Sequence, residues 1–478
     1  MAITAATQSR AAAVQAVTSA NYLDIQNDGW AAQYLPDLMA KEAEVFGKRT
    51  ISGFLSQVGA EESMAADQVI WSEQGRLHLS YKCEMNTVLS NTIDITQNID
   101  GVAQTNDHGV RVGDQVLIAG GGQTITARVS VAAAGAVNTI TVQPYGFATL
   151  ATAGFVDGDD DCTILVFGSE NAKGESYLGG RSNKPSFTTF TNKPIILRDQ
   201  YEVSGSDVAQ IGWVEVSGED GQNGYYWYLK AEGDTRSRFT DYCEMSLIES
   251  EKVAENSAIA LPTDGGVGTA GTEGLFSAVK SRGHQSSGVT GVNAATDLAE
   301  FDAILAEFDK NGAIEENMMF VNRATALAID DMLASMNSYG AGGTSWGVFD
   351  NDEDMALNLG FSGFRRGSYD FYKSDWKYLN DLSTRGGINA AATGGEAIRG
   401  MMIPAGVSSV YDQSLGKNLK RPFLHVRYRA SKLESRKFKT WVTGSVGAKT
   451  SDLDAMTMNF LSERCLVVQG ANNFMMMN

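Results

Sequence analysis

A change in the pattern of apolar, polar and glycine residues near residue 101 limits the possible fold more than any other feature of this chain. From about Gly101 to Glu170 the sequence contains short alternating runs separated by glycine-rich turns, among them 125–131 and 137–142. Alternation of apolar and polar residues is typical of half-buried strands, and several short strands at this spacing predict a small β-barrel or sandwich. Because longer and more mixed elements flank this stretch, we interpret it as a β-domain inserted into a larger body.

Helical and extended patterns share the rest of the chain and predict an α+β fold. The longest helical pattern covers Tyr225–Glu255, where Phe239, Cys243 and Leu247 recur on one face. Thr296 and Asn322 are predicted N-caps of two further helices. Strands are predicted near residues 318–321, 369–372, 400–403, 424–428, 438–442 and 465–468.

The segment that precedes the β-rich block is predicted to be extended. The runs 68–71 and 77–81 alternate, and Gln74-Gly75 is the predicted turn of a hairpin between them. Residues 1–60 are predicted to form an arm. Its apolar cluster, which includes Trp30 and Tyr34, is too small to form a core and is expected to pack on the body or on a neighbouring subunit.

A basic segment contrasts with an otherwise acidic chain. The net charge is −19, yet residues 417–439 hold nine Lys or Arg and one acid. Alternation over 424–429 puts Arg427 and Arg429 on one face of a strand and apolar side chains on the other. We predict that Arg427, Arg429, Lys437 and Lys439 contact acidic surface on a neighbouring subunit. The alternative is a solvated edge strand that its charges protect from pairing.

Patterns that would indicate an enzyme lack the surroundings that their chemistry needs. Gly266–Gly271 matches a nucleotide-binding glycine motif but follows Pro262-Thr263-Asp264, not a strand. Ser345 lies in a match to the nucleophile elbow without a strand before it or a helix after it. We therefore expect a protein that is not an enzyme and has no catalytic residue.

Metal and cofactor sites are also not expected. The aspartates at 157 and 159–161 resemble part of a calcium loop, but Cys162 and Gly168 occupy two of its essential positions. The four histidines and four cysteines are far apart in the sequence and form no metal-ligand spacing. Such cysteines are typical of buried free thiols in a reducing cytoplasm. No signal peptide and no run of about 20 apolar residues is evident, so neither export nor a membrane is expected.

The order of these parts resembles the major capsid proteins of tailed bacteriophages, which have the Johnson fold (Hong Kong 97-type). The phrases that carry the resemblance are spread over most of the chain: 68–73, Leu197–Ser206, Tyr225–Glu255, Gly271–Leu275, Asp297–Met336, Tyr369–Lys373, Met401–Pro404 and Met458–Val468. The inserted block at 101–170 is longer than the basic fold requires, and no crosslinking pair can be identified.

The resemblance implies a division of the chain into parts. They are an N-terminal arm at 1–60, an extended loop region at 61–200 that holds the inserted β-domain, a peripheral domain at 201–290 with a spine helix at 225–255, an axial domain at 291–440 and closing peripheral strands at 441–478. It also implies self-assembly into hexamers and pentamers of a shell around double-stranded DNA, which the chain contacts only non-specifically. Portal, scaffold and decoration proteins would be partners, with assembly in the host cytoplasm and a final place in the virion. The alternative is an exported surface-layer or adhesive β-rich protein.

Overall fold

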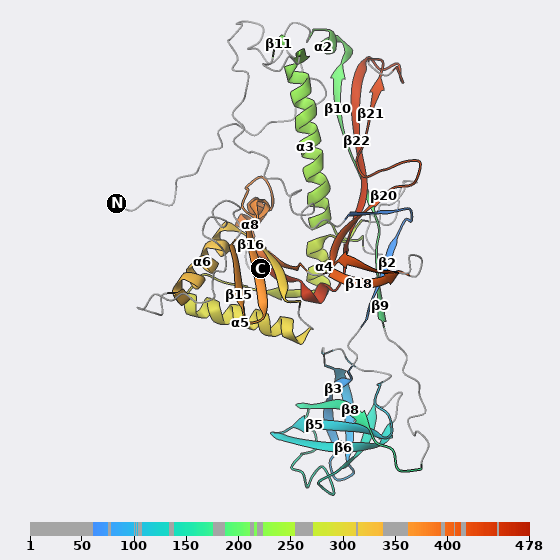
Figure 1. The fold of residues 1–478 in the computed structure, drawn as a ribbon, viewed down its shortest axis with the longest axis vertical. Helices are drawn as coiled ribbons and strands as arrows, with labels where there is room; N and C mark the ends of the chain where they lie inside the picture. The colour runs from blue at the N-terminus through green and yellow to red at the C-terminus, as the bar shows by residue number, and fades with distance from the viewer. Residues whose placement is uncertain are drawn as a thin grey trace, which may run out of the picture. The chain divides into compact units, whose positions relative to one another are not determined.

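The structure, a computed structural model, describes residues 61–74, 78–99, 101, 103, 108–132, 138–174, 187–210, 215–217, 223–253, 271–311, 314–337, 362–392, 397–405, 407–412, 417–446 and 449–478. Helices and strands are mixed along these residues, which confirms the α+β class (Figure 1). The chain divides into two compact units: residues 72–189, and residues up to 71 together with 190–478. The predicted arm, with Trp30 and Tyr34, lies outside the described residues.

The unit at 72–189 contains a closed six-stranded barrel. Its strands, in the order in which they pair, are β3 (Ser80–Thr87), β4 (Thr92–Asn98), β7 (Thr139–Pro144), β6 (Gln123–Ala132), β5 (Asp114–Gly120) and β8 (Cys162–Ser169). Every second side chain points inward, so that Cys83, Met85, Val116, Ile140 and Ile164 are fully buried in one core. The predicted β-domain is therefore present and is a barrel, not a sandwich.

The barrel begins earlier than the sequence predicted, because β3 and β4 belong to it. These strands bury Cys83, Met85, Ile93 and Ile95 in the same core as the later strands. The predicted hairpin between 68–71 and 77–81 is wrong: β2 (Val69–Gln74) pairs with β9 (Phe187–Asn192), more than a hundred residues later. Alternation identified the strands correctly but carries no information on which strand each one pairs with.

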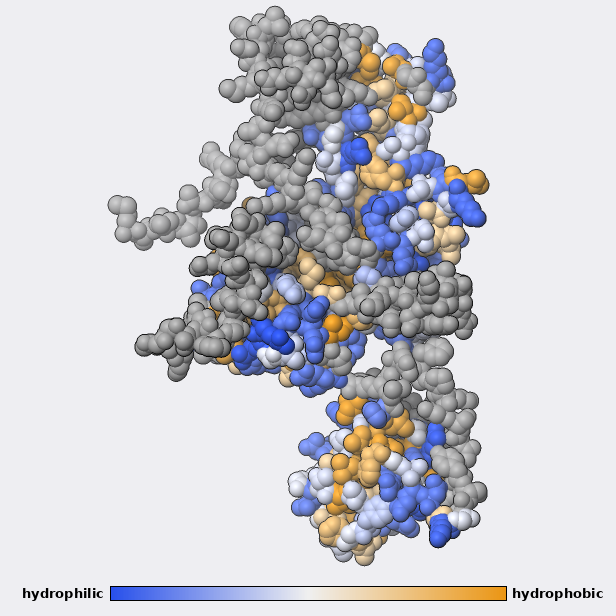
Figure 2. All heavy atoms as spheres, viewed as in Figure 1, coloured by the Kyte–Doolittle hydropathy of each residue, from blue (hydrophilic) through white to orange (hydrophobic). Residues whose placement is uncertain are grey.

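A two-residue turn sets the register of β5 against β6. Gly120 pairs with Gln123, and the residues between them, Gly121 and Gly122, have φ angles of 56° and 78°. Two successive positive φ angles define the tight hairpin turn whose twist matches that of the strands, and glycine adopts them without steric cost. Apolar side chains also occur on the outside of the barrel, among them Leu165 and Phe167 of β8, and orange residues are visible on the face of this unit in Figure 2.

The second unit contains a five-stranded sheet around one long strand. This strand, β22 (Ala455–Val468), pairs along its first part with β10 (Ile195–Ser204) and β21 (Lys439–Gly444), and along its last part with β20 (Leu424–Arg429). A short strand, β1 (Glu61–Met64), runs parallel to β20 on its other side. Because β20 lies between two strands, its interpretation as a solvated edge strand is wrong.

The long helix α3 (Tyr226–Glu249) packs on this sheet, as Figure 1 shows beside β10 and β22. Its 24 residues span about 36 Å at the usual rise per residue. Phe239 and Cys243 meet Phe460 of β22 in a small buried cluster. The predicted face of this helix is therefore correct, and the predicted range 225–255 is longer than the helix at its C-terminal end.

A six-stranded sheet forms the other layer of this unit. Its strands, in pairing order, are β13 (His284–Ser286), β23 (Met475–Met477), β17 (Gly400–Pro404), β14 (Glu316–Val321), β16 (Tyr369–Asp375) and β15 (Ser362–Arg366). Helices α5 (Ala294–Lys310) and α6 (Arg323–Asn337) pack on one face, through residues such as Phe301 and Met332. The opposite face packs on α4 (Leu275–Arg282) and on apolar residues of β20 and β22.

Several smaller elements complete the unit. They are α2 (Gly205–Gln210), β11 (Glu215–Ser217), β12 (Asn223–Tyr225), η2 (Lys377–Leu379), α8 (Arg385–Ala391), β18 (Val407–Asp412), β19 (Lys417–Pro422) and η4 (Ala471–Asn473). The end of the chain crosses between the two sheets: β22 lies in the five-stranded sheet, whereas β23 lies inside the six-stranded one. The predicted closing segment at 441–478 thus contributes to both sheets, and β20, from the predicted axial range 291–440, lies in the sheet of β22.

Candidate functional site: a buried anchor and a charged strip

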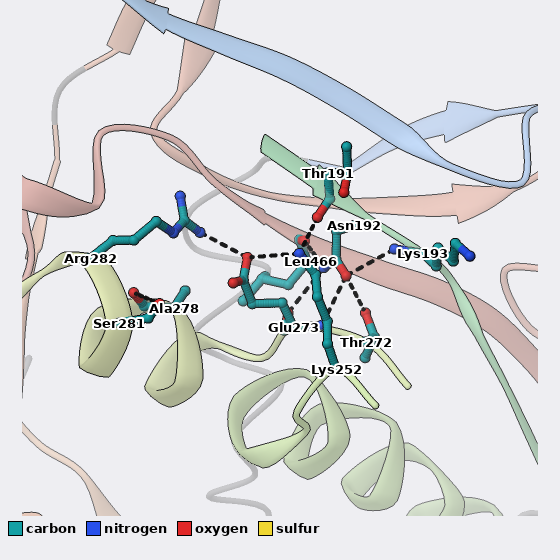
Figure 3. A network of polar contacts seen from close by, with 10 residues as sticks. All are labelled: Thr191, Asn192, Lys193, Lys252, Thr272, Glu273, Ala278, Ser281, Arg282 and Leu466. Atoms are coloured by element: carbon teal, nitrogen blue, oxygen red, sulfur yellow. Dashed lines mark hydrogen bonds and ion pairs between the residues drawn. The ribbon is translucent and has the colours of Figure 1, made fainter. Parts of the chain in front are cut away.

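A buried asparagine fixes the strand β9 where it ends. The Asn192 side chain is 1% exposed. Its amide nitrogen donates to the Leu466 carbonyl oxygen at 2.6 Å and to that of Glu273 at 3.0 Å. Its oxygen accepts from the Glu273 backbone N–H at 2.8 Å and from the Thr272 hydroxyl at 3.2 Å (Figure 3). One side chain thus joins the strand to β22 and to the segment that leads into α4.

Charged and aromatic groups surround this anchor. Arg282 of α4 donates to the Glu273 carboxylate at 2.8 Å, and Lys252 lies 3.9 Å from the same carboxylate and donates to the Thr191 carbonyl (Figure 3). The Arg282 guanidinium also lies 4.4 Å from the ring centre of Phe190. A cation over an aromatic face is a favourable contact, so α4 holds β9 through both its charge and its stacking. We call Asn192, Glu273, Arg282 and Phe190 the ribbon anchor.

The C-terminal end of α3 is held by a second polar group. The Glu249 carboxylate accepts from the Tyr378 hydroxyl and from the Arg385 guanidinium, each at 2.8 Å. Burial and the Glu249 charge raise the pKa of Tyr378 far above its usual range. Tyr378 therefore stays a neutral donor, and the pair fixes the end of the helix to η2 and α8.

The four basic residues singled out from the sequence lie on or beside β20 and β21. Three of them form ion pairs with acids of the same chain. Arg427 pairs with Glu62 at 2.7 Å. Arg429 pairs with Asp67, and with Glu463 at 3.3 Å. Lys437 pairs with Glu61. We call these four contacts the charged strip; Glu61 and Glu62 of the edge strand β1 take part in two of them.

Lys439 belongs to a separate surface group. It pairs with Glu434 at 2.6 Å, which lowers the pKa of that carboxyl, and its ammonium lies 5.7 Å from the Trp441 ring centre. Both partners of the pair are exposed, so the pair itself adds little to stability. Sequence reasoning identified the cations and missed their acidic partners. The adjacent acids Glu61 and Glu62 were the available sequence signal for these partners. No sequence signal distinguished Asn192.

The motifs considered for chemistry have structural roles where the structure describes them. Asp157 accepts from the Val88 backbone N–H at 2.7 Å and Asp159 accepts from that of Asp161 at 3.2 Å, so both carboxylates support turns of the barrel. Among the described residues no three His, Cys, Asp or Glu side chains are grouped as metal ligands. All four cysteines are buried free thiols. Ser345 and residues 266–270 lie outside the described part of the chain.

No helix in the described ranges is both long enough and apolar enough to cross a lipid bilayer.

The chain was compared with known proteins. No family model and no curated protein sequence matches it. Among solved structures, one from Microbacterium phage Oxtober96 is similar at 9% identity and a TM-score of 0.40, over 95% of this chain and 99% of that one. A capsid structure of the cyanophage P-SCSP1u has 9% identity and a TM-score of 0.33, over 65% and 80% of the two chains. A mature capsid of bacteriophage PhiM1 has 8% identity and a TM-score of 0.33, over 65% and 78%.

Proposed function

We propose that this chain is the major capsid protein of a tailed bacteriophage and has the Johnson fold (Hong Kong 97-type). The observation that carries the proposal is the order and pairing of its elements. A two-stranded ribbon of β2 and β9 comes before the long helix, and the helix packs on a sheet built around the late strand β22. A helix–strand–helix segment then places β14 in a second sheet that its two helices cover. This is the order that the sequence resemblance implies.

In this proposal each part of the chain has a structural role. The ribbon of β2 and β9 is the base of the extended loop, and the barrel is its insertion. The helix α3 is the spine, the sheet around β22 is the peripheral domain, and the sheet covered by α5 and α6 is the axial domain. The chain acts without catalysis, and the ribbon anchor fixes the base of the extended loop to the body.

The proposed assembly is a closed shell of hexamers and pentamers that encloses double-stranded DNA. Arg427, Arg429, Lys437 and Lys439 would face acidic surface of a neighbouring subunit, and Trp30 and Tyr34 of the arm would pack on a neighbour. Portal, scaffold and decoration proteins would be further partners. Assembly would take place in the host cytoplasm, and the mature location would be the virion.

The test is assembly of the purified full-length chain, with a scaffold protein where one is needed. Light scattering should report particles far larger than a subunit, and negative-stain microscopy should show closed shells. Flat or tubular arrays would favour the alternative of a surface-layer protein. A compact monomer that persists under all assembly conditions would contradict the proposal.

A further inference from the structure

Two acidic side chains, Asp241 and Glu244, lie one helical turn apart on α3, away from the face on which Phe239 meets the sheet. Glu244 is 4% exposed, although glutamate is almost never fully buried unless it is paired. Asp241 is half-buried. One carboxyl oxygen of each is buried and has no hydrogen-bond partner among the described residues. No ion pair to either carboxyl occurs within those residues. A carboxylate in that position would carry a large desolvation cost.

The cations nearest to this pair have other partners. On α3, Arg238 pairs with Asp199 of β10 at 3.1 Å. On β22, Arg464 donates to the Ser462 hydroxyl at 2.7 Å and to the Lys437 carbonyl at 2.9 Å. The charge of Arg464 favours ionisation of Glu244, but burial and the neighbouring Asp241 outweigh it.

The other titratable groups on the packed elements add no compensating charge. Cys243 is a buried free thiol whose pKa is raised by burial, and β10 contributes the hydroxyl of Tyr201. Glu463 of β22 pairs with Arg436 and Arg429. On α4, Arg282 pairs with Glu273, and Lys280 is exposed.

We propose that Asp241 and Glu244 form a proton-binding site on α3, and that loss of its proton lowers the stability of the folded subunit. Burial and the negative charge of Asp241 raise the pKa of Glu244 to about 8, and burial raises the pKa of Asp241. The neutral Glu244 can occupy the contact without a buried charge. This site does not depend on the proposed function, because it acts within one subunit.

The sign of the pH dependence follows from linkage. The folded pKa of Glu244 lies above its value in the unfolded chain. The stabilisation is therefore complete below the ordinary carboxyl pKa of 4.5, and it is lost progressively as the pH rises towards about 8. Above about pH 8 Glu244 has lost its proton in the folded and the unfolded chain alike, so the loss of stability no longer increases.

The experiment compares urea unfolding of the full-length chain and of Glu244→Gln from about pH 5 to about pH 9, at a concentration where neither variant associates. Glutamine is the neutral isostere of the protonated side chain, so it should keep the contact and remove its titration. The ratio of the unfolding constants, wild type over variant, should rise by up to about tenfold per pH unit and level off above about pH 8. The matched control Asp234→Asn, on an exposed position of the same helix, should give a ratio that does not change with pH. A flat ratio for Glu244→Gln would overturn the proposal.

A second variant tests whether the two carboxyls act together. Asp241→Asn removes the neighbouring negative charge while keeping the shape of the side chain. The pH above which the loss of stability levels off should move to lower values, because Glu244 then ionises more easily. If that pH does not change, Asp241 takes no part in the site, and the paired assignment is overturned.

Discussion

At the scale of single residues, the structure concentrates several hydrogen bonds on Asn192. We expect Asn192→Ala to lower the free energy of unfolding by about 3 kcal/mol, because the Leu466 and Glu273 carbonyls and the Glu273 N–H lose their buried partner. Denaturant unfolding at a fixed pH measures this loss. Asn472→Ala, at an exposed asparagine of the same unit, is the control and should change stability by less than about 0.5 kcal/mol. Equal losses in the free energy of unfolding of the two variants would show that the hydrogen bonds of Asn192 add no more stability than those of an exposed asparagine.

Residue-scale signals in the sequence were informative where they were local. Asn322 was predicted as an N-cap, and its side-chain oxygen does accept from the Thr325 backbone N–H at 2.8 Å. Thr296 was predicted to cap α5, but the helix already begins at Ala294. The Asp297 carboxylate, in the first turn of the helix, accepts from the N–H of Gly291 in the preceding loop. Asn192, by contrast, bonds to a strand 274 residues away, and no local pattern encodes such a partner.

At the scale of elements, the barrel is a separable unit with its own core. We expect that replacing residues 78–174 by a short flexible linker leaves the rest of the chain able to unfold cooperatively, because the barrel core cluster is made entirely of residues 79–166. Removing only 101–170 should instead cause aggregation. It leaves β3 and β4 behind, with Cys83, Met85, Ile93 and Ile95 uncovered.

Circular dichroism and denaturant unfolding of the two deletion variants measure this difference. Loss of cooperative unfolding in the longer deletion would mean that the barrel is part of the main fold. The comparison matters because the sequence alone predicted a boundary at residue 101. The pattern there changes at the glycines and short runs, whereas β3 and β4 alternate in the same way as strands of an extended loop. Periodicity therefore predicted the elements well and their partners poorly.

The shortest elements were outside the reach of sequence patterns. The strand β23 is three residues of methionine, which have no alternation to detect. It is placed between β13 and β17 by tertiary pairing. The long helix was predictable for the opposite reason, because a face with Phe239 and Cys243 repeats over several turns.

At the scale of the whole molecule, the acidic net charge gives the surface basic groups two possible kinds of partner. One is an acid of the same chain, and the structure has such acids beside Arg427, Arg429, Lys437 and Lys439. The other is an acid of a neighbouring subunit, as proposed for assembly. A simple reversal of Arg427 or Arg429 cannot separate them, because it also places like charges beside Glu62 or the buried Glu463.

Exchanging both members of an exposed pair separates the two roles. In the double variant Lys439→Glu with Glu434→Lys, the pair within the chain is kept and the charge that faces outward at each position is inverted. Both side chains are more than 40% exposed, so the subunit should keep its stability within about 0.5 kcal/mol. If neighbouring subunits contact these charges, the yield of particles measured by light scattering should fall. Because a shell repeats each contact many times, small pairwise losses add up.

Wild-type assembly should also weaken with salt, as screening shortens the reach of exposed charges. The matched control is the exchange at Glu307 and Lys310, an exposed pair on α5 at 2.6 Å. Normal, salt-insensitive assembly of the Lys439 exchange variant would show that these cations serve only the fold of their own subunit.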